Sequence, residues 1–298
     1  MKSSRRLHDE LQFVSEFSTL FDVLQQAATS QLRRTQEQAS RHPRLTEILG
    51  REYLPLLPSA SQHHRLVRGG RAGRLLVLIA SEEGFVGPLY TALAREARAK
   101  ADETTQWLLV GRRGLRLLGS RAAQAKVIPL PPEELADEQM RRVGQFVMAS
   151  YRQADLRDAW LVAPRFVSAT HQEVAATQLL PIPAGASRGH AVSRELIIEP
   201  SLDRVLEQLA LLWTEAVCVE AFWSARCAEF AARALHVEVS RQELSKRARV
   251  LHHEFFKALH ERVDLLVRET CVVQRYAAKH LQASARSSGA PLVRAPSP

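Results

Sequence analysis

Glycine and proline, the two residues that most readily end a helix, are missing from long stretches near both ends of this chain. No glycine lies between His190 and Ser288, and no proline lies between Ser201 and Ala290. The first 42 residues also contain neither. This absence excludes frequent turns in both stretches. We therefore predict a long helix in residues 1–42 and a longer one in residues 202–281.

Cysteines and long apolar runs are also scarce. Cys218, Cys227 and Cys271 are the only cysteines among 298 residues, and all fall in the last predicted helix without metal-ligand spacing. We expect small apolar side chains in a reducing compartment, with no disulfide framework and no metal. No apolar run approaches the roughly 20 residues that cross a bilayer, so we expect no transmembrane segment in this sequence. The charged, amphipathic N-terminus is unlike a secretory signal.

The basic excess is moderate and spread along the chain. The formal net charge is +9, without concentration in one segment. A nucleic-acid-binding protein usually gathers its basic residues on one face, so we expect no nucleic-acid partner. The closest approach to a cluster is a glycine-containing connector with Arg65, Arg68, Arg71 and Arg74. It fits a solvated linker or a phosphate site, and the linker is the simpler interpretation.

Apolar residues in both predicted helices recur at alternating steps of three and four. This period marks one narrow apolar stripe per helix, as in a coiled coil. At about 1.5 Å per residue, the C-terminal helix would be a rod on the order of 120 Å long, which needs a partner helix. The simplest partner is the N-terminal helix, laid antiparallel. The N-terminal stripe is Leu7, Leu11, Val14, Phe17, Phe21, Leu24, Ala28 and Leu32, and the C-terminal stripe runs through Leu206, Trp213, Trp223, Phe230, Leu244, Leu251, Phe255, Leu259, Val263, Leu266 and Val273.

One stretch weakens the C-terminal prediction. Residues 236–239 are mediocre helix formers. Ser240 and Glu243 then have the spacing of a capping box, which would start a new helix. The sequence is compatible with one helix or with two stacked helices, and we favour one.

The middle of the chain alternates between strand and helix patterns. Such alternation implies crossover connections and a largely parallel, Rossmann-like sheet. We therefore predict an α/β fold in which an antiparallel coiled coil of long terminal helices flanks a central Rossmann-like domain. The expected divisions are 1–60 (N-terminal helix and connector), 61–200 (α/β domain), 201–281 (C-terminal helix) and 282–298 (disordered tail). The expected strands are 74–80, 106–111, 125–130 and 158–164, with weaker strands at 174–180 and 195–198, and the expected helices are 88–101, 112–120 and 133–153.

No catalytic constellation emerges from the candidate motifs. Residues 81–87 place two glycines after a strand, but a dinucleotide fingerprint needs a third and a Walker loop needs a lysine. Glu82 and Glu83 would also repel a phosphate. His253 and Glu254 begin a zinc-protease pattern, yet Lys257 occupies the second histidine position. We expect no catalytic, cofactor-binding or metal-binding residues.

Seven short segments in order resemble the γ subunit of rotary F-type ATP synthases. Residues 27–36 (AATSQLRRTQ) resemble the family's A-A-S-K-x-R-R-A-Q, and residues 81–90 (SEEGFVGPLY) resemble its S-D-R-G-L-C-G-G-x-N. Residues 111–114 match G-x-K-G, residues 165–168 and 178–182 resemble its F-x-S and Q-L-L-P-[IL] strands, and residues 199–201 match E-P-[SD]. Residues 225–227 with Phe230 fall where the family has A-R-M and a further methionine. The likeness covers residues 7–267.

The resemblance implies a non-catalytic central stalk, or rotor shaft, that couples ion translocation to ATP synthesis or hydrolysis. The implied partners are the F1 alpha and beta subunits, the epsilon subunit and the membrane c-ring. The implied location is peripheral, on the cytoplasmic face of the bacterial inner membrane. By analogy, the residues expected to contact the alpha3-beta3 bore are Leu24, Arg33, Arg34, Leu251, Phe255, Leu259, Val263 and Leu266.

Two departures from the family pattern keep other functions open. Asp22 lies at the position nearest to the lysine of the family's K-I-T-x-A-M motif. Residues 253–261 (HEFFKALHE) lie where the family has R-Q-x-x-I-T-x-E near the end of the C-terminal helix. The altered start is closer to the variant γ subunits of alternative, sodium-type F-ATPases. A divergent γ-like protein without coupling is one alternative. An α/β enzyme with a helical dimerisation arm and an unrelated coiled-coil scaffold are the others.

Overall fold

Contacts along the chain divide it into two units, each of which is described separately. The computed structural model describes residues 4–40, 45–53, 64–84, 86–122, 124–182 and 198–287. The first unit comprises Met1–Phe21 and Ser240–Pro298, and the second comprises Asp22–Val239. The two long terminal helices contribute residues to both units.

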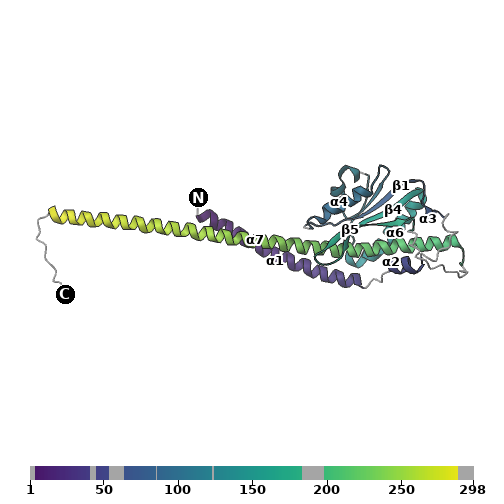
Figure 1. Ribbon diagram of the computed structural model, residues 1–298, viewed down its shortest axis with the longest axis horizontal. Coiled ribbons are helices and arrows are strands. Elements are labelled where there is room, and N and C mark those ends of the chain that lie inside the picture. Colours follow the sequence, from purple (N-terminus) through teal and green to yellow (C-terminus); the bar gives the residue numbers. More distant parts are fainter. Residues whose placement is uncertain are drawn as a thin grey trace. The chain divides into compact units, whose positions relative to one another are not determined.

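The two terminal helices are uninterrupted (Figure 1). Helix α1 spans Ser4–Ser40, and helix α7 spans Leu202–Ser287, a length of 86 residues. The prediction of one C-terminal helix is therefore confirmed over the alternative of two. A capping box starts a helix only where the preceding residues leave helical geometry, and without glycine or proline nothing forces them to do so. Helix α7 extends to Ser287 and so enters the predicted tail at 282–298, because no glycine or proline ends it earlier. The rest of that tail and most of the weak strand at 195–198 lie outside the described residues.

A five-stranded sheet forms the centre of the second unit. Its strands are β1 (Ala72–Ile79), β2 (Gln106–Val110), β3 (Lys126–Ile128), β4 (Leu156–Phe166) and β5 (Gln172–Leu180), in the spatial order β3-β2-β1-β4-β5. Strands β3, β2, β1 and β4 are parallel, and β5 pairs antiparallel with β4. The largely parallel Rossmann-like sheet predicted from the alternating pattern is confirmed.

Helices cover both faces of the sheet (Figure 1). Helix α4 (Leu89–Lys100) and helix α5 (Arg113–Leu118) lie on one face, and α6 (Ala136–Gln153) lies on the other with α7. In β1, Leu75, Val77 and Ile79 face α6 and α7. Leu76 and Leu78 point to the α4 side. Because both faces are buried there, residues 75–79 of β1 are apolar at every position rather than at alternate ones.

The connector between α1 and β1 is partly helical where it is described. It contains α2 (Leu45–Ile48), a π-helical turn η1 (Leu49–Tyr53) and α3 (Arg65–Arg68). Arg65 pairs with Asp155 at 2.9 Å and donates to the carbonyl of Tyr151 at 3.0 Å, so it is not a free linker residue. The remaining short elements are the 3₁₀ turns η4 (Gly119–Ala122) and η5 (Glu133–Leu135).

Helices α6 and α7 approach each other closely at Gly144. A Cβ atom built on Gly144 would lie 2.9 Å from the Cα of Glu215 and 3.0 Å from its backbone nitrogen. Such distances are too short for carbon, so any larger residue would force the helices apart. Nearby on the same faces, Gln145 donates to the Glu215 carboxylate at 2.8 Å.

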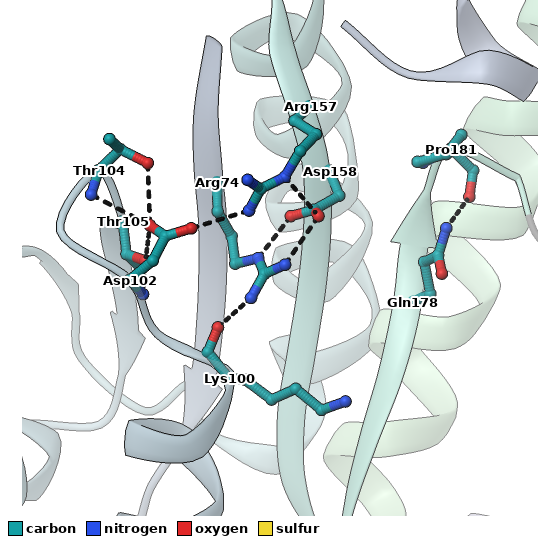
Figure 2. Close-up of polar contacts among 9 residues, drawn as sticks. All are labelled: Arg74, Lys100, Asp102, Thr104, Thr105, Arg157, Asp158, Gln178 and Pro181. Carbon is teal, nitrogen blue, oxygen red and sulfur yellow. Dashed lines mark hydrogen bonds and ion pairs between the residues drawn. The ribbon is translucent and has the colours of Figure 1, made fainter. Parts of the chain in front are cut away.

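An ion-pair cluster ties β1 to β4 near the start of both strands (Figure 2). Arg74 donates to both oxygens of Asp158 at 2.6 and 2.8 Å, and Arg157 reaches Asp102 at 2.8 Å and Asp158 at 3.1 Å. Thr104 and Thr105 complete the hydrogen bonds to Asp102. Burial alone would raise the pKa values of Asp102 and Asp158, but these hydrogen bonds hold both below their ordinary values.

Candidate functional site

In the first unit, α1 and α7 share one apolar seam. Leu7, Val14 and Leu251 are buried there. The rings of His8 and Phe255 lie 6.1 Å apart. In the second unit, Leu32 packs with Cys227, Phe230 and Ala231. Rising numbers in α1 therefore meet falling numbers in α7, and the helices run antiparallel as predicted.

Beyond Ala258 the seam of α7 has no counterpart among the described residues. Among the described residues, the apolar cluster that α1 forms with α7 extends no further along α7 than Ala258. Residues 259–280 are all exposed, and we call them the bare segment of α7. Its apolar side chains are between 39% and 66% exposed, and these are Leu259, Val263, Leu265, Leu266, Val267, Val272, Val273 and Tyr276.

The residues predicted as shaft contacts fall into three kinds of environment. Leu259, Val263 and Leu266 lie in the bare segment. Leu251 is 1% exposed and faces α1, and Phe255 is half-buried beside it. On α1, Leu24 is half-buried, Arg33 is exposed, and Arg34 forms an exposed ion pair with Glu133 at 3.7 Å. The predicted contact residues on α7 therefore all lie in the first unit, and those on α1 all lie in the second unit.

Helix α1 carries exposed apolar residues beside its buried seam. Phe13, Phe17 and Leu20 are 57%, 37% and 52% exposed. The rings of Phe13 and Phe17 lie 4.4 Å apart. Their spacing of four and three places them on one side of the helix, flanking the seam. The spacing predicted Phe17 in the seam, but Phe17 is 37% exposed, whereas Val14 is buried there with Leu251.

In the second unit, a charged cluster ties α7 to the segment after β1. Arg226, Glu229 and Arg233 lie on successive turns of α7, and their side chains are 15%, 6% and 8% exposed. Glu229 accepts from Arg226 at 2.7 Å and from Arg233 at 2.6 Å. Arg233 also pairs with Glu83 at 3.0 Å, and Ser81 Oγ donates to Glu229. We call these five residues the α7 clamp.

Neighbouring groups complete the clamp. Arg233 Nε donates to the carbonyl of Gly84 at 3.2 Å, and the backbone nitrogen of Ser81 donates to the hydroxyl of Tyr90 at 2.8 Å. The guanidinium groups of Arg226 and Arg233 lie 4.4 and 5.3 Å from the centre of the Phe230 ring. Buried charges are stable only when such partners replace water, and removing one partner is costly. The clamp therefore fixes the orientation of α7 on the sheet.

This clamp was not predicted from the sequence. The acidic side chains of residues 81–87 were considered only as groups that would repel a phosphate, and no structural role was predicted for Arg226, Glu229 or Arg233. Their spacing of three and four residues along an apolar stripe could have indicated a buried ion-pair cluster, because charged residues are rarely buried without partners.

Features of an active site do not appear among the described residues. No group of three histidine, cysteine, aspartate or glutamate residues there is placed to hold a metal. Burial raises the pKa of the Cys218 thiol to about 12 and that of Cys227 to about 11, which suppresses the reactive thiolate. In the same part of the chain, none of the helices has the length and apolar content needed to span a membrane.

Comparison of the sequence with known families gives one broad match. The family model described as ATP synthase matches residues 3–258. A curated relative from Akkermansia muciniphila, named ATP synthase gamma chain, is 22% identical over 253 residues, which cover 78% of this chain and 84% of the relative. The gamma chain of Methylacidiphilum infernorum is 20% identical and covers 92% and 99%. That of Erythrobacter litoralis is 25% identical and covers 70% and 77%.

Solved structures share the fold at low sequence identity. A chain of the Euglena gracilis mitochondrial ATP synthase, in a structure of OSCP, F1 and the c-ring, superposes with a TM-score of 0.64 at 15% identity and covers 98% of each chain. A chain from the rotor of the same enzyme gives 0.62, covering 87% of this chain and 98% of its own. A chain from the Tetrahymena thermophila central stalk and c-ring gives 0.55 at 18% identity and covers 74% and 99%.

Proposed function

This chain belongs to the ATP synthase family, as a relative of its gamma chains, and from that membership we propose that the bare segment of α7 is the part of a central stalk that enters the ring of catalytic subunits. The chain is a non-catalytic subunit of an F-type ATP synthase. Its task is mechanical, since it couples ion translocation to ATP synthesis or hydrolysis without binding the nucleotide.

The observation that carries this proposal is the exposure of the bare segment. Eight apolar side chains between residues 259 and 276 are at least 39% exposed on one helix. Apolar surface of this extent on a soluble domain usually marks an interaction site. A helix that is apolar on several sides suits a bore that surrounds it better than a partner that meets one face.

The specific partners follow from the family. We propose that the alpha and beta subunits surround the bare segment, and that the epsilon subunit and the c-ring contact the α/β domain. The location proposed is peripheral, on the cytoplasmic face of a bacterial inner membrane. In this arrangement three chemically identical catalytic sites meet different sides of one asymmetric helix pair. Differential contact then gives each site a different affinity, and turning the stalk interchanges them.

Coupling also requires that turning the α/β domain turns α7. The buried clamp supports this role because it joins α7 to the segment after β1 through an ion pair and a charge-assisted hydrogen bond rather than through apolar contact alone. Apolar packing is non-directional, whereas charge-assisted hydrogen bonds fix an angle about the helix axis. Helix α7 runs without a break from the clamp into the bare segment.

The test replaces the apolar contacts of the bare segment without altering the fold. The chain carrying Leu259→Gln, Val263→Gln and Leu266→Gln is assembled with the alpha, beta, epsilon and membrane subunits of its own organism in vesicles. Ion pumping per ATP hydrolysed is then measured. We expect the ratio to fall about tenfold, because contacts at the centre of an interface carry most of its energy.

A matched control carries His260→Gln, Glu261→Gln and Asp264→Gln in the same turns of α7. These side chains are exposed and polar, so we expect the pumping ratio to stay within about twofold of the wild type. An unchanged ratio in the apolar variant would contradict the shaft role. Assembly without pumping by the wild-type chain would favour a divergent gamma-like protein that no longer couples.

A further inference from the structure

The bare segment of α7 carries one apolar stripe at coiled-coil spacing. Leu259, Val263, Leu266, Thr270 and Val273 follow one another at steps of four and three, the spacing of the a and d positions in a heptad repeat. The four apolar members are between 39% and 66% exposed. The hydroxyl of Thr270 donates to the carbonyl of Leu266 at 2.8 Å, so a second helix can cover the stripe without leaving this hydroxyl unpaired.

Two charged residues flank the stripe without a counter-charge on their own helix. Arg262 and Glu269 are exposed, and neither forms an ion pair among the described residues. Opposite charges on one helix pair at separations of three and four residues. At those separations both residues have only apolar neighbours, which are Ala258, Leu259, Leu265, Leu266, Val272 and Val273. A counter-charge for Arg262 and Glu269 must therefore come from another helix.

The spacing of the two charges matches an antiparallel pair of identical helices. Arg262 and Glu269 each precede an a position, so both occupy g positions of consecutive heptads. In an antiparallel coiled coil, an a residue faces a d residue of the other helix, and g residues lie beside g residues. When Val263 faces Leu266 of a second copy, Arg262 lies beside Glu269 of that copy. By symmetry the same ion pair forms a second time.

The same charges oppose the other arrangements. Sliding one copy by a heptad in one direction brings Arg262 beside Arg262, and sliding it in the other direction brings Glu269 beside Glu269. In a parallel dimer, a g residue lies beside the e residue five positions further on, so Arg262 meets Val267 and Glu269 meets Gln274. Only the antiparallel arrangement with Val263 opposite Leu266 pairs opposite charges, which is how a surface selects one partner geometry.

We propose that the unassembled chain forms an antiparallel homodimer through the bare segment, with two ion pairs between Arg262 and Glu269. Three kinds of layer, each present twice, make its core: Val263 with Leu266, Leu259 with Thr270, and Val273 with Phe256, which is itself 53% exposed. The inference concerns the chain alone and does not depend on the shaft role. A ring of catalytic subunits around the bare segment would contact the same residues, so the dimer would have to separate before assembly.

Charge exchange at the two g positions tests the register. Sedimentation equilibrium of the full chain at micromolar concentrations and low ionic strength measures the dissociation constant of the dimer. Arg262→Glu replaces two attractive contacts with two repulsive ones, and we expect it to raise that constant at least about tenfold. Glu269→Arg should do the same. An equimolar mixture of the two variants should dimerise again, because each charge then meets its opposite in the mixed pair.

Arg268→Glu is the matched control, since it makes the same change of charge on the side of the helix away from the stripe. We expect it to change the dissociation constant by less than about twofold. The proposal is overturned if the wild-type chain sediments as a monomer at every micromolar concentration, or if Arg262→Glu leaves the dimer intact. It is equally overturned if the mixture of variants stays monomeric, or if Arg268→Glu weakens the dimer as much as Arg262→Glu does.

Discussion

Helix α7 contains two segments of similar sequence pattern and opposite environment. Residues 202–239, which we call the covered segment, bury Leu206, Trp213, Phe222 and Phe230 against the sheet, α6 and α1. The bare segment carries apolar residues at comparable spacing and buries none of them. The same apolar periodicity thus packs against the protein's own core in the covered segment. In the bare segment it leaves an apolar surface that other molecules can contact.

This difference separates stability from function along a single helix. Substitutions in the covered segment should change the free energy of unfolding, and substitutions in the bare segment should change assembly and coupling. The predictions below test that separation and, last, the stability of the underlying sheet, beginning with the largest expected effect.

The cysteines report directly on the two environments. Burial raises the pKa of the Cys218 thiol to about 12, whereas Cys271 is exposed. At pH 8 we expect Cys271 to react with iodoacetamide more than about 1,000-fold faster, because only the thiolate is the nucleophile and access is also blocked. Mass spectrometry of peptides sampled over time measures both rates. Equal rates in the native chain, without denaturant, would contradict the burial of the covered segment.

Two phenylalanines give the matched test of packing. Phe222 is fully buried, and Phe256, near the start of the exposed turns, is 53% exposed. We expect Phe222→Ala to lower the free energy of unfolding by about 4 kcal/mol, and Phe256→Ala to lower it by less than about 0.5 kcal/mol. Urea denaturation followed by circular dichroism measures both. Similar losses in the two variants would contradict the difference in burial between these two positions of α7.

Two ion pairs on α7 extend the comparison to charged groups. Glu229 of the clamp is 6% exposed, whereas the pair of Lys246 and Glu243 is more than 70% exposed at both ends. We expect Glu229→Gln to cost about 3 kcal/mol, since two buried arginines lose their carboxylate. Glu243→Gln should cost less than about 0.5 kcal/mol.

In assembled complexes, Glu229→Gln should also lower ion pumping per ATP if the clamp fixes the angle of α7. Arg74→Met, which disrupts the cluster joining β1 to β4, supplies the control because that cluster does not include α7. We expect it to destabilise the chain without lowering the pumping ratio. A fall of the ratio in both variants would assign the effect to lost stability instead.

The smallest expected effect is the response of the underlying sheet to acid. The pKa values of Asp102 and Asp158 are lower in the folded protein than in the unfolded chain, so the unfolded chain binds more protons in acid. Their contribution is complete above about pH 4 and is lost as the pH falls toward the folded values. After solvent screening we expect a loss of about 1 kcal/mol between pH 5 and pH 2.5. The urea concentration at the unfolding midpoint should depend less steeply on pH in this range when Asp158 is replaced (Asp158→Asn).

Much of the architecture could be predicted from the sequence because it depends on local pattern. The absence of glycine and proline from residues 202–281 predicted one helix, and the apolar run of β1 predicted a strand buried on both faces. The pairing direction of β5 could not be predicted, since Val174 and Ala176 fit a parallel or an antiparallel neighbour equally well. The site required distant contacts as well. No local rule indicates that Ser81 and Glu229 meet across 148 positions of sequence.

The contact at Gly144 has a consequence for rotation. Because backbone meets backbone there, α6 cannot slide or roll over α7 without lifting away from it. The close contact at Gly144 therefore restrains rotation of α6 and α7 about each other. A torque applied to the sheet is carried to α7 by hard contact at this point, and even one added methyl group would loosen the fit.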